Sequence, residues 1–328
     1  MRAFEYTSPK TREQVVSLLG KNWGEVEVLA GGTDLLSLMK DEVTTPKRLV
    51  NIKDIEELHG ITRGPGPGLR FGALVTLAEI GRNEGVQAEL PALAAAGADA
   101  ASPQIRNMAT LGGNLCQRPR CWYFRTGNGL LAQDKDGGSM ILKGDNRYHA
   151  ILGNDGPAYF VSPSTVVPVL IAYRATVRLF GPEGPRELPL EKFFVIPKTE
   201  REREHDLKPS EFVTDVLVPP ARDVRAAQYE IRQKEAFDWP YATAAVALAM
   251  NGDTVESARV VMGHVAPVPW LSNEAAQVLT GKTITRATAE QAAQAAVKNA
   301  KSLGHNKEKI HLAKVAVQRA ILKAGGVA

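Results

Sequence analysis

The sequence is poor in cysteine, with only Cys116 and Cys121 among 328 residues, so no disulfide framework is expected. The formal net charge of +4 is small for this length and gathers in no tail, which does not favour nucleic-acid binding. The longest apolar stretch, residues 161–173, is broken by prolines and hydroxyls and is too short to cross a bilayer. Residues 1–6 lack the apolar core of a secretory signal. We therefore expect a soluble globular protein that is kept in the cytoplasm.

The sequence also lacks the usual catalytic motifs. It contains no His-Glu metal motif, no G-x-G-x-x-G opening a helix and no convincing set of nucleophile, base and acid. A protein that holds a redox cofactor needs none of these, because the cofactor itself supplies the chemistry. We therefore predict no catalytic side chain and look for a binding site.

The stretch at residues 29–36, LAGGTDLL, is the first candidate. The apolar run before it predicts a strand and the residues after it predict the start of a helix, with Gly31 and Gly32 in the turn between. Glycine tolerates positive φ and has no Cβ, so successive amide N–H groups can converge on an anion. The N-terminus of the following helix adds further free N–H groups. The stretch is compatible with a phosphate cradle, although two glycines between a strand and a helix usually make only a turn.

Residues 109–115, ATLGGNL, repeat the arrangement far downstream. Each Gly-Gly pair has a hydroxyl and a short polar side chain beside it, Thr33 with Asp34 in the first and Thr110 with Asn114 in the second. Two such turns can hold a diphosphate from both sides. We expect main-chain donors from Gly31, Gly32, Gly112 and Gly113 to dominate this grip, and we expect Asp34 to fix the backbone of its own turn.

With both turns in this order, the sequence resembles the FAD-binding subunits of molybdenum hydroxylases, the medium subunits of the xanthine dehydrogenase and carbon monoxide dehydrogenase type. Residues 71–77 (FGALVTL), 232–238 (RQKEAFD) and 263–270 (GHVAPVPW) also fit the family, so the resemblance covers nearly the whole chain. It implies an α+β fold, with a two-part FAD-binding domain of the vanillyl-alcohol oxidase/PCMH type followed by a C-terminal α+β flavoprotein domain.

The expected domains are residues 1–55 and 56–222 for the two parts of the FAD-binding domain and residues 223–328 for the last domain. The cofactor-binding residues that the two turns and the resemblance nominate are Leu29, Ala30, Gly31, Gly32, Thr33, Asp34, Leu35, Ala73, Thr110, Gly112, Gly113, Asn114, Ser162, Ser164 and Lys234. For Ser164 the alternative is a helix cap, and for Lys234 it is an exposed lysine at a strand end.

An irregular segment at residues 116–149, which we call the insert, resembles a branch of the family that binds an extra [4Fe–4S] cluster through four cysteines. Such a cluster needs about four thiolates, and this chain offers only Cys116 and Cys121. An unusual ligand set drawing on His149 or Asp134 stays open as a minor alternative. A zinc site from the two cysteines and His149 lacks a fourth ligand. We therefore expect FAD, no [4Fe–4S] cluster and no metal site.

The resemblance implies an electron-transfer subunit of a multi-subunit oxidoreductase. Its partners are a large subunit with the molybdenum cofactor and a small subunit with [2Fe–2S] clusters, and electrons leave FAD to an external acceptor. The alternatives are a free-standing FAD oxidoreductase and a flavin-less assembly subunit. Export on a partner's signal peptide is the alternative to a cytoplasmic location. The substrate is not predicted, because its pocket lies on another chain.

Three local patterns complete the analysis. Thr76 with Glu79 has the form of a capping box, and so does Thr288 with Gln291. Residues 158–161 are apolar and aromatic, which predicts a strand. Residues 198–208 alternate acids and bases, which predicts a solvated surface segment and no binding patch.

Overall fold

The computed structural model describes residues 1–64, 66–234 and 237–327. Its first part, the N-terminal unit, is a small parallel sheet with the strand order β1-β3-β2. The elements of this unit are β1 (Glu5–Thr7), α1 (Arg12–Leu18), β2 (Val26–Leu29), α2 (Leu35–Lys40) and β3 (Arg48–Asn51). The first Gly-Gly turn connects the end of β2 to the start of α2, as the sequence predicts.

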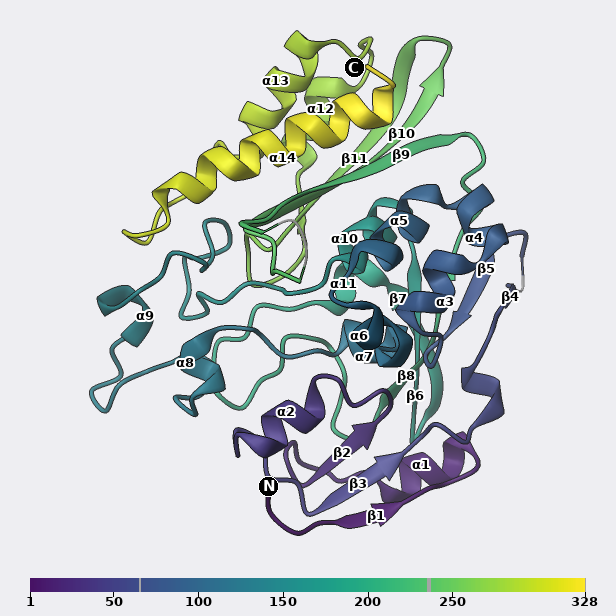
Figure 1. The fold of residues 1–328 in the computed structure, drawn as a ribbon, viewed down its shortest axis with the longest axis vertical. Coiled ribbons are helices and arrows are strands. Elements are labelled where there is room, and N and C mark those ends of the chain that lie inside the picture. The colour runs from purple at the N-terminus through teal and green to yellow at the C-terminus, as the bar shows by residue number, and fades with distance from the viewer. Residues whose placement is uncertain (65, 235–236, 328) are drawn as a thin grey trace.

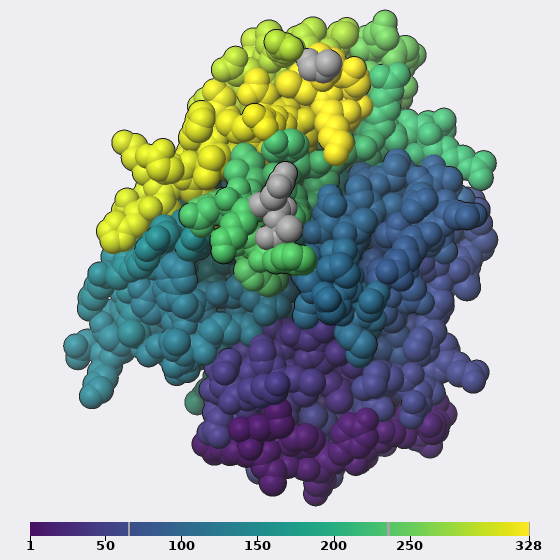
Figure 2. All heavy atoms as spheres, viewed as in Figure 1, coloured from purple at the N-terminus to yellow at the C-terminus, as the bar shows by residue number. Residues whose placement is uncertain are grey.

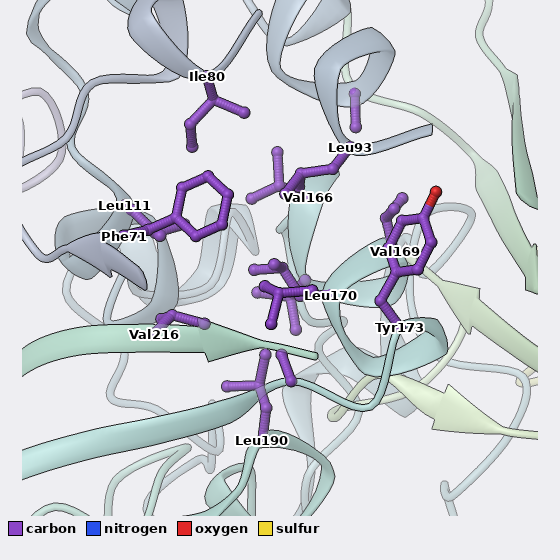
Figure 3. Packing of buried hydrophobic residues seen from close by; sticks show 14 of the residues in the cluster. Phe71, Ile80, Leu93, Leu111, Val166, Val169, Leu170, Tyr173, Leu190 and Val216 are labelled. Carbon is purple, nitrogen blue, oxygen red and sulfur yellow. The ribbon is translucent and has the colours of Figure 1, made fainter. Parts of the chain in front are cut away.

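The middle unit is built on a five-stranded antiparallel sheet with the order β4-β5-β8-β6-β7. Its strands are β4 (Ile61–Arg63), β5 (Leu69–Gly72), β6 (Thr176–Gly181), β7 (Gly184–Pro189) and β8 (Phe212–Val218). Its helical segments are η1 (Glu56–Leu58), α3 (Leu77–Arg82), α4 (Glu84–Glu89), α5 (Pro91–Asp99), α6 (Pro103–Met108), α7 (Leu111–Leu115), α10 (Val166–Ala172) and α11 (Leu190–Phe193). The buried ring of Phe71 on β5 and Leu111 on α7 belong to one hydrophobic core (Figure 3), which fixes the second Gly-Gly turn against the sheet.

The C-terminal unit is a four-stranded antiparallel sheet with the order β12-β11-β10-β9, packed against helices that include the long α14. Its elements are β9 (Val224–Ile231), β10 (Ala242–Asn251), β11 (Thr254–Gly263), β12 (Trp270–Leu271), α12 (Asn273–Leu279), α13 (Arg286–Ala296) and α14 (Lys307–Gly325). Figure 1 shows this unit and the N-terminal unit at opposite ends of the molecule.

The sheet of the C-terminal unit is covered on both faces, because β10 is apolar along most of its length. Side chains alternate between the faces of a strand, so Ala245 and Ala247 join the core of the middle unit while Ala244 and Val246 join the core beneath α14. The small alanine side chains let both layers approach closely, and the two larger units are packed together through this strand.

The insert contains two short helices, α8 (Trp122–Arg125) and α9 (Met140–Lys143). It has a small core of its own, which includes Phe124 and Ile141 and also takes in Leu38 from α2. Across the ranges that the structure describes, no helix combines the length and apolarity needed to cross a membrane.

Two local predictions are wrong. Residues 158–161 form no strand and have no regular structure. The capping box of α13 is formed by Thr285 and Thr288, one turn earlier than predicted, because the helix begins at Arg286. The first capping box is confirmed: Thr76 accepts from the amide of Glu79, whose side chain accepts in return from the amide of Thr76.

Candidate functional site

A cavity of about 750 Å³ lies between the N-terminal unit and the middle unit and extends beside the insert. Figure 2 shows the N-terminal unit, in purple, packed directly against the blue and teal segments that form the other walls. Predicted site residues that line the cavity are Ala30, Gly31, Gly32, Thr33, Asp34, Leu35, Ala73, Thr110, Gly112 and Gly113. The fold therefore brings both Gly-Gly turns and Ala73 to one space that is large enough for a cofactor.

The backbone amides of the first turn are free to donate hydrogen bonds. Among the described residues, every backbone amide from Gly31 to Leu35 lacks a hydrogen bond to the protein. Gly32 has a φ of +73°, which side-chain-bearing residues rarely adopt. A Cβ on Gly31 would lie 1.8 Å from the carbonyl oxygen of Met108, so only glycine lets the two turns come this close. Buried or half-buried amides need a partner, and a bound anion would supply it.

The second turn differs from the first, because the amides of its two glycines already donate hydrogen bonds within the protein. The amide of Gly112 donates to the carbonyl of Ala73 at 2.8 Å, and that of Gly113 donates to the hydroxyl of Thr110 at 3.2 Å. In this structure these two amides are therefore already hydrogen-bonded within the protein, and their share in the grip stays a prediction. Gly112 and Gly113 contribute a wall without side chains, since a Cβ on Gly113 would meet only the Thr110 hydroxyl and otherwise open space.

Asp34 ties the first turn to the insert and does not bond to its own turn. One carboxylate oxygen accepts from the amide of Arg118 at 2.8 Å. The other pairs with Arg120 at 2.9 Å and Arg125 at 2.7 Å. The two arginines together exceed the single carboxylate in charge, so the region beside the open amides is positive. Asp34 therefore fixes the turn through contacts with the insert.

Three predicted residues lie together in a separate narrow recess, which Asn114, Ser162 and Ser164 help to line. The Ser164 hydroxyl accepts from the amide of Val167 at 3.1 Å, as a cap on α10 would, and donates to the Asn114 side chain at 2.5 Å. The cap interpretation of Ser164 is supported. The side chains of Asn114 and Ser164 are partnered with each other, and none of the three residues lines the main cavity.

Two other predicted residues lie off the cavity. Leu29 is buried at the end of β2, where its carbonyl accepts from the amide of Ile52. Lys234 is exposed and does not line the cavity. The residues that follow it in the family-like phrase, Glu235 and Ala236, lie outside the described residues. The position of Lys234 fits the alternative of an exposed strand-end lysine.

The prediction of a solvated segment at residues 198–208 holds for residues 198–202, 206 and 208, which are exposed, and is wrong for residues 203–205. Glu204 and His205 are buried, and Arg203 lines the cavity and pairs with Glu27 of β2 at 3.0 Å. Burial raises the pKa of Glu27 to about 7, against the opposing effect of nearby Arg118. A regular alternation along the sequence is also typical of an extended segment that turns one face inward. This alternation was the one feature of the sequence that could have indicated the burial.

The two cysteines lie in different surroundings. Cys116 lines the cavity, and burial raises the pKa of its thiol to about 12. Cys121 is buried with its sulfur 3.2 Å from Nε2 of His149, whose pKa is lowered to about 4 by burial. Within the part of the chain that the structure describes, no three His, Cys, Asp or Glu side chains are grouped to hold a metal ion.

The residues present fit a diphosphate-bearing cofactor such as FAD. The unpaired amides of residues 31–35 supply donors, the side-chain-free wall at Gly113 leaves room for an anion, and the arginines around Asp34 supply positive charge. Diphosphates are bound in this way by consecutive backbone donors at the end of a strand. The carboxylate of Asp34 does not repel such a ligand, because its charge is neutralised by the insert.

Comparison with known proteins agrees with this geometry. A family model described as "FAD binding domain in molybdopterin dehydrogenase" matches residues 2–221, and one described as "CO dehydrogenase flavoprotein C-terminal domain" matches residues 227–324. The aldehyde oxidoreductase FAD-binding subunit PaoB of Escherichia coli is 32% identical over 272 residues, which is 82% of this chain and 84% of that protein. The carbon monoxide dehydrogenase medium chain of Hydrogenophaga pseudoflava is 30% identical over 294 residues, 90% of this chain and 86% of that protein.

A solved structure gives the same result for the fold. A chain of the carbon monoxide dehydrogenase from Hydrogenophaga pseudoflava, in a form that lacks the Mo-pyranopterin moiety of the molybdenum cofactor, superposes with a TM-score of 0.77 at 29% sequence identity. The match covers 99% of this chain and 98% of that one. The predicted fold class, a two-part FAD-binding domain followed by a C-terminal flavoprotein domain, is confirmed.

Proposed function

The chain belongs to the FAD-binding medium subunits of the molybdenum hydroxylase family, and we propose that it relays electrons within such a complex. The proposed partners are a large subunit with the molybdenum cofactor and a small subunit with [2Fe–2S] clusters. Support comes from the relatives, which are named as a FAD-binding subunit of an aldehyde oxidoreductase and a medium chain of a carbon monoxide dehydrogenase. The proposed direction is from the iron–sulfur clusters to FAD and on to an external acceptor.

The observation that carries the proposal is the run of unpaired amides from Gly31 to Leu35 on the cavity wall. These groups would bind the diphosphate of FAD, and the Thr33 hydroxyl lies in the same stretch to add a side-chain bond. Bound FAD supplies the chemistry, because its flavin ring accepts and releases electrons. The protein's own tasks are to hold the cofactor, to orient it and to set the charge around it.

Asp34 and the insert carry out the orienting task. The insert is anchored at a second place, where the amides of Leu130 and Leu131 donate to the Glu200 carboxylate at 2.6 and 2.8 Å. Since Arg118, on the same insert, contacts Asp34 through its backbone, the first turn is held from outside its own unit. A turn fixed in this way keeps its amides in place when the ligand leaves, which reduces the ordering cost of binding.

The test is an absorption spectrum of the purified protein, with iron and acid-labile sulfide assayed on the same sample. We expect a flavin spectrum, restored by added FAD if the cofactor is lost during purification, and no iron. Gly113→Val should abolish FAD retention, because it places a side chain on the open wall. Gly85→Val is the matched control, since a Cβ there also meets only the oxygen of a helix cap, that of Asn83, and lies on α4 away from the cavity.

Each alternative gives a different result. A chain that takes up no flavin would favour the assembly subunit and refute the proposal. About four irons per chain would mean that the insert holds a cluster through non-cysteine ligands. A yellow protein that reacts alone with a small substrate, and does not co-purify with molybdenum and iron–sulfur subunits, would favour the free-standing oxidoreductase.

A further inference from the structure

One wall of the cavity is an irregular segment that is open to solvent on its other side. This segment is residues 198–203, which we call the strap, and the cavity is lined by four of its residues, Glu200, Arg201, Glu202 and Arg203. Residues 198–202 are exposed. Because the same segment contacts both the cavity and the solvent, it closes this part of the cavity, and its movement would open a path for a bound molecule.

The backbone gives the strap little support. Among the described residues, the only backbone–backbone hydrogen bond of residues 198–203 is internal, from the amide of Glu202 to the carbonyl of Thr199 at 3.3 Å. The nearest β-bridge lies outside the strap, between Phe194 and His205. Exposed segments with few backbone hydrogen bonds open locally at a low cost in free energy. The strap is therefore held closed by its side chains.

Glu200 fastens one end of the strap to the insert. Its two carboxylate oxygens accept from the amides of Leu130 at 2.6 Å and Leu131 at 2.8 Å. Both leucines are buried, and a buried amide that loses its acceptor is costly. Hydrogen bonds to an ionised group are also stronger than those between neutral groups. This single carboxylate therefore contributes a strong contact between two segments that lie about 70 residues apart in the sequence.

The insert is shaped to receive this carboxylate. Gly129 has a φ of +76°, and a Cβ on it would lie 2.9 Å from each carboxylate oxygen of Glu200. Successive amides in such a turn form a concave site for an anion. The neighbouring Gly127 has a φ of +88°, but a Cβ on it would meet nothing within 4 Å. Gly129 is therefore required by the contact with Glu200, whereas Gly127 is required only by its turn.

The other end of the strap is attached at a less exposed place. The side chain of Arg203 is 11% exposed and pairs with Glu27 of β2 at 3.0 Å. Its guanidinium carbon also lies 4.7 Å from the centre of the Trp23 ring. Ion pairs shielded from water are costly to break, because a charge is left uncompensated. Glu200, in contrast, is exposed, so the Arg203 end is the firmer attachment of the strap.

We propose that the strap is a gate for cofactor exchange, with Glu200 as its latch and its hinge near Arg203. The inference rests on the proposed function, because the cavity must hold a cofactor for its exchange to be gated. A gate differs from a binding contact in its kinetics. It slows entry and release by the same factor, because both require the open strap, and so it leaves the Kd unchanged. A contact with the ligand itself slows release and lowers the Kd.

The test measures the two rate constants of FAD binding with the purified full chain. Stopped-flow flavin fluorescence gives the binding rate, and exchange of bound radiolabelled FAD for an excess of unlabelled FAD gives the release rate. In Glu200→Ala, we expect both rate constants to rise about tenfold or more, because a hydrogen bond to a charged group contributes at least this factor. The Kd should equal that of the wild type. Glu183→Ala is the charge control, since it removes an exposed carboxylate between β6 and β7 that does not line the cavity.

Gly129→Ala breaks the latch from the side of the insert without a change of charge. Its Cβ would displace the Glu200 carboxylate, so both rate constants should rise as in Glu200→Ala, again with an unchanged Kd. Gly127→Ala is the matched control. It places a Cβ at a similarly positive φ in the same loop but meets no atom within 4 Å, so both rate constants should stay at the wild-type values.

The outcomes separate gating from its alternatives. If the release rate alone rises in Glu200→Ala, with a matching rise in Kd, Glu200 acts through the insert on the first Gly-Gly turn and the gate is refuted. If neither rate constant changes, the gate is also refuted, although FAD binding in the cavity would stand. If the wild-type protein binds no FAD, the proposed function fails and the inference fails with it.

Discussion

Replacing Asp34 by asparagine should loosen the contact between the first Gly-Gly turn and the insert. The side chain of Asp34 is 15% exposed, and those of Arg120 and Arg125 are 27% and 16% exposed, so these ion pairs are largely shielded from water. Removing one partner of a buried pair costs about 3–5 kcal/mol, because the other charge is left uncompensated. Here the two guanidiniums retain some solvent and other acceptors, so we expect the low end, about 3 kcal/mol.

The assay is urea unfolding of the flavin-free protein, followed by circular dichroism, with thermal unfolding in parallel. Unfolding entropy is about 2.1 cal/mol/K per residue, so a 3 kcal/mol loss over 328 residues lowers Tm by about 4 °C. Asp54→Asn is the control. Asp54 pairs with Lys10 in the same unit, but both side chains are well exposed, at 45% and 67%, and the change should be undetectable.

A double-mutant cycle isolates the ion pair itself. Arg125→Met and the double variant Asp34→Asn/Arg125→Met are compared with the single variants and the wild type. We expect a coupling free energy of about 2 kcal/mol between these two side chains. A coupling near zero, or an Asp34→Asn protein as stable as the wild type, would refute the claim that Asp34 fastens the turn to the insert.

Two more predictions follow from buried positions. Gly31→Ala should lower both Tm and FAD affinity, because its Cβ would lie 1.8 Å from the carbonyl oxygen of Met108. Gly156→Ala is the control, since a Cβ there meets nothing within 4 Å and should change neither quantity. Equal Tm values for the two variants would contradict this steric argument. Burial lowers the pKa of Lys309 to about 7 from the usual 10.5. Between these pH values the unfolded chain binds more protons than the folded chain, so the free energy of unfolding rises with pH, by at most about 1.4 kcal/mol per pH unit. Lys309→Met lacks this dependence, so the free energy of unfolding of the variant minus that of the wild type, measured in urea, should fall from pH 7 to pH 9. A difference that is independent of pH would rule out the lowered pKa.

The sequence alone was sufficient for the fold class and the cofactor. The glycine pairs are a local property of the chain, since positive φ and the absence of a Cβ follow from residue type. Their position after a strand and before a helix follows from short-range hydrophobic pattern. The resemblance built on these motifs gave the two-part FAD-binding domain and the C-terminal domain. The domain boundaries and the individual cofactor contacts remain predictions.

Only the tertiary structure decided which groups of the two turns are free to bind. The amide of Gly112 is used by the carbonyl of Ala73, whereas those of residues 31–35 have no protein partner. The sequence cannot distinguish these cases, because the acceptor comes from a distant strand. The same holds for Asp34, whose partners on the insert are more than 80 residues away, and for Arg203 and His205, whose charged neighbours predicted a solvated surface. Burial and pairing are properties of the packed chain, and long-range packing determines whether a polar group meets water, protein or ligand.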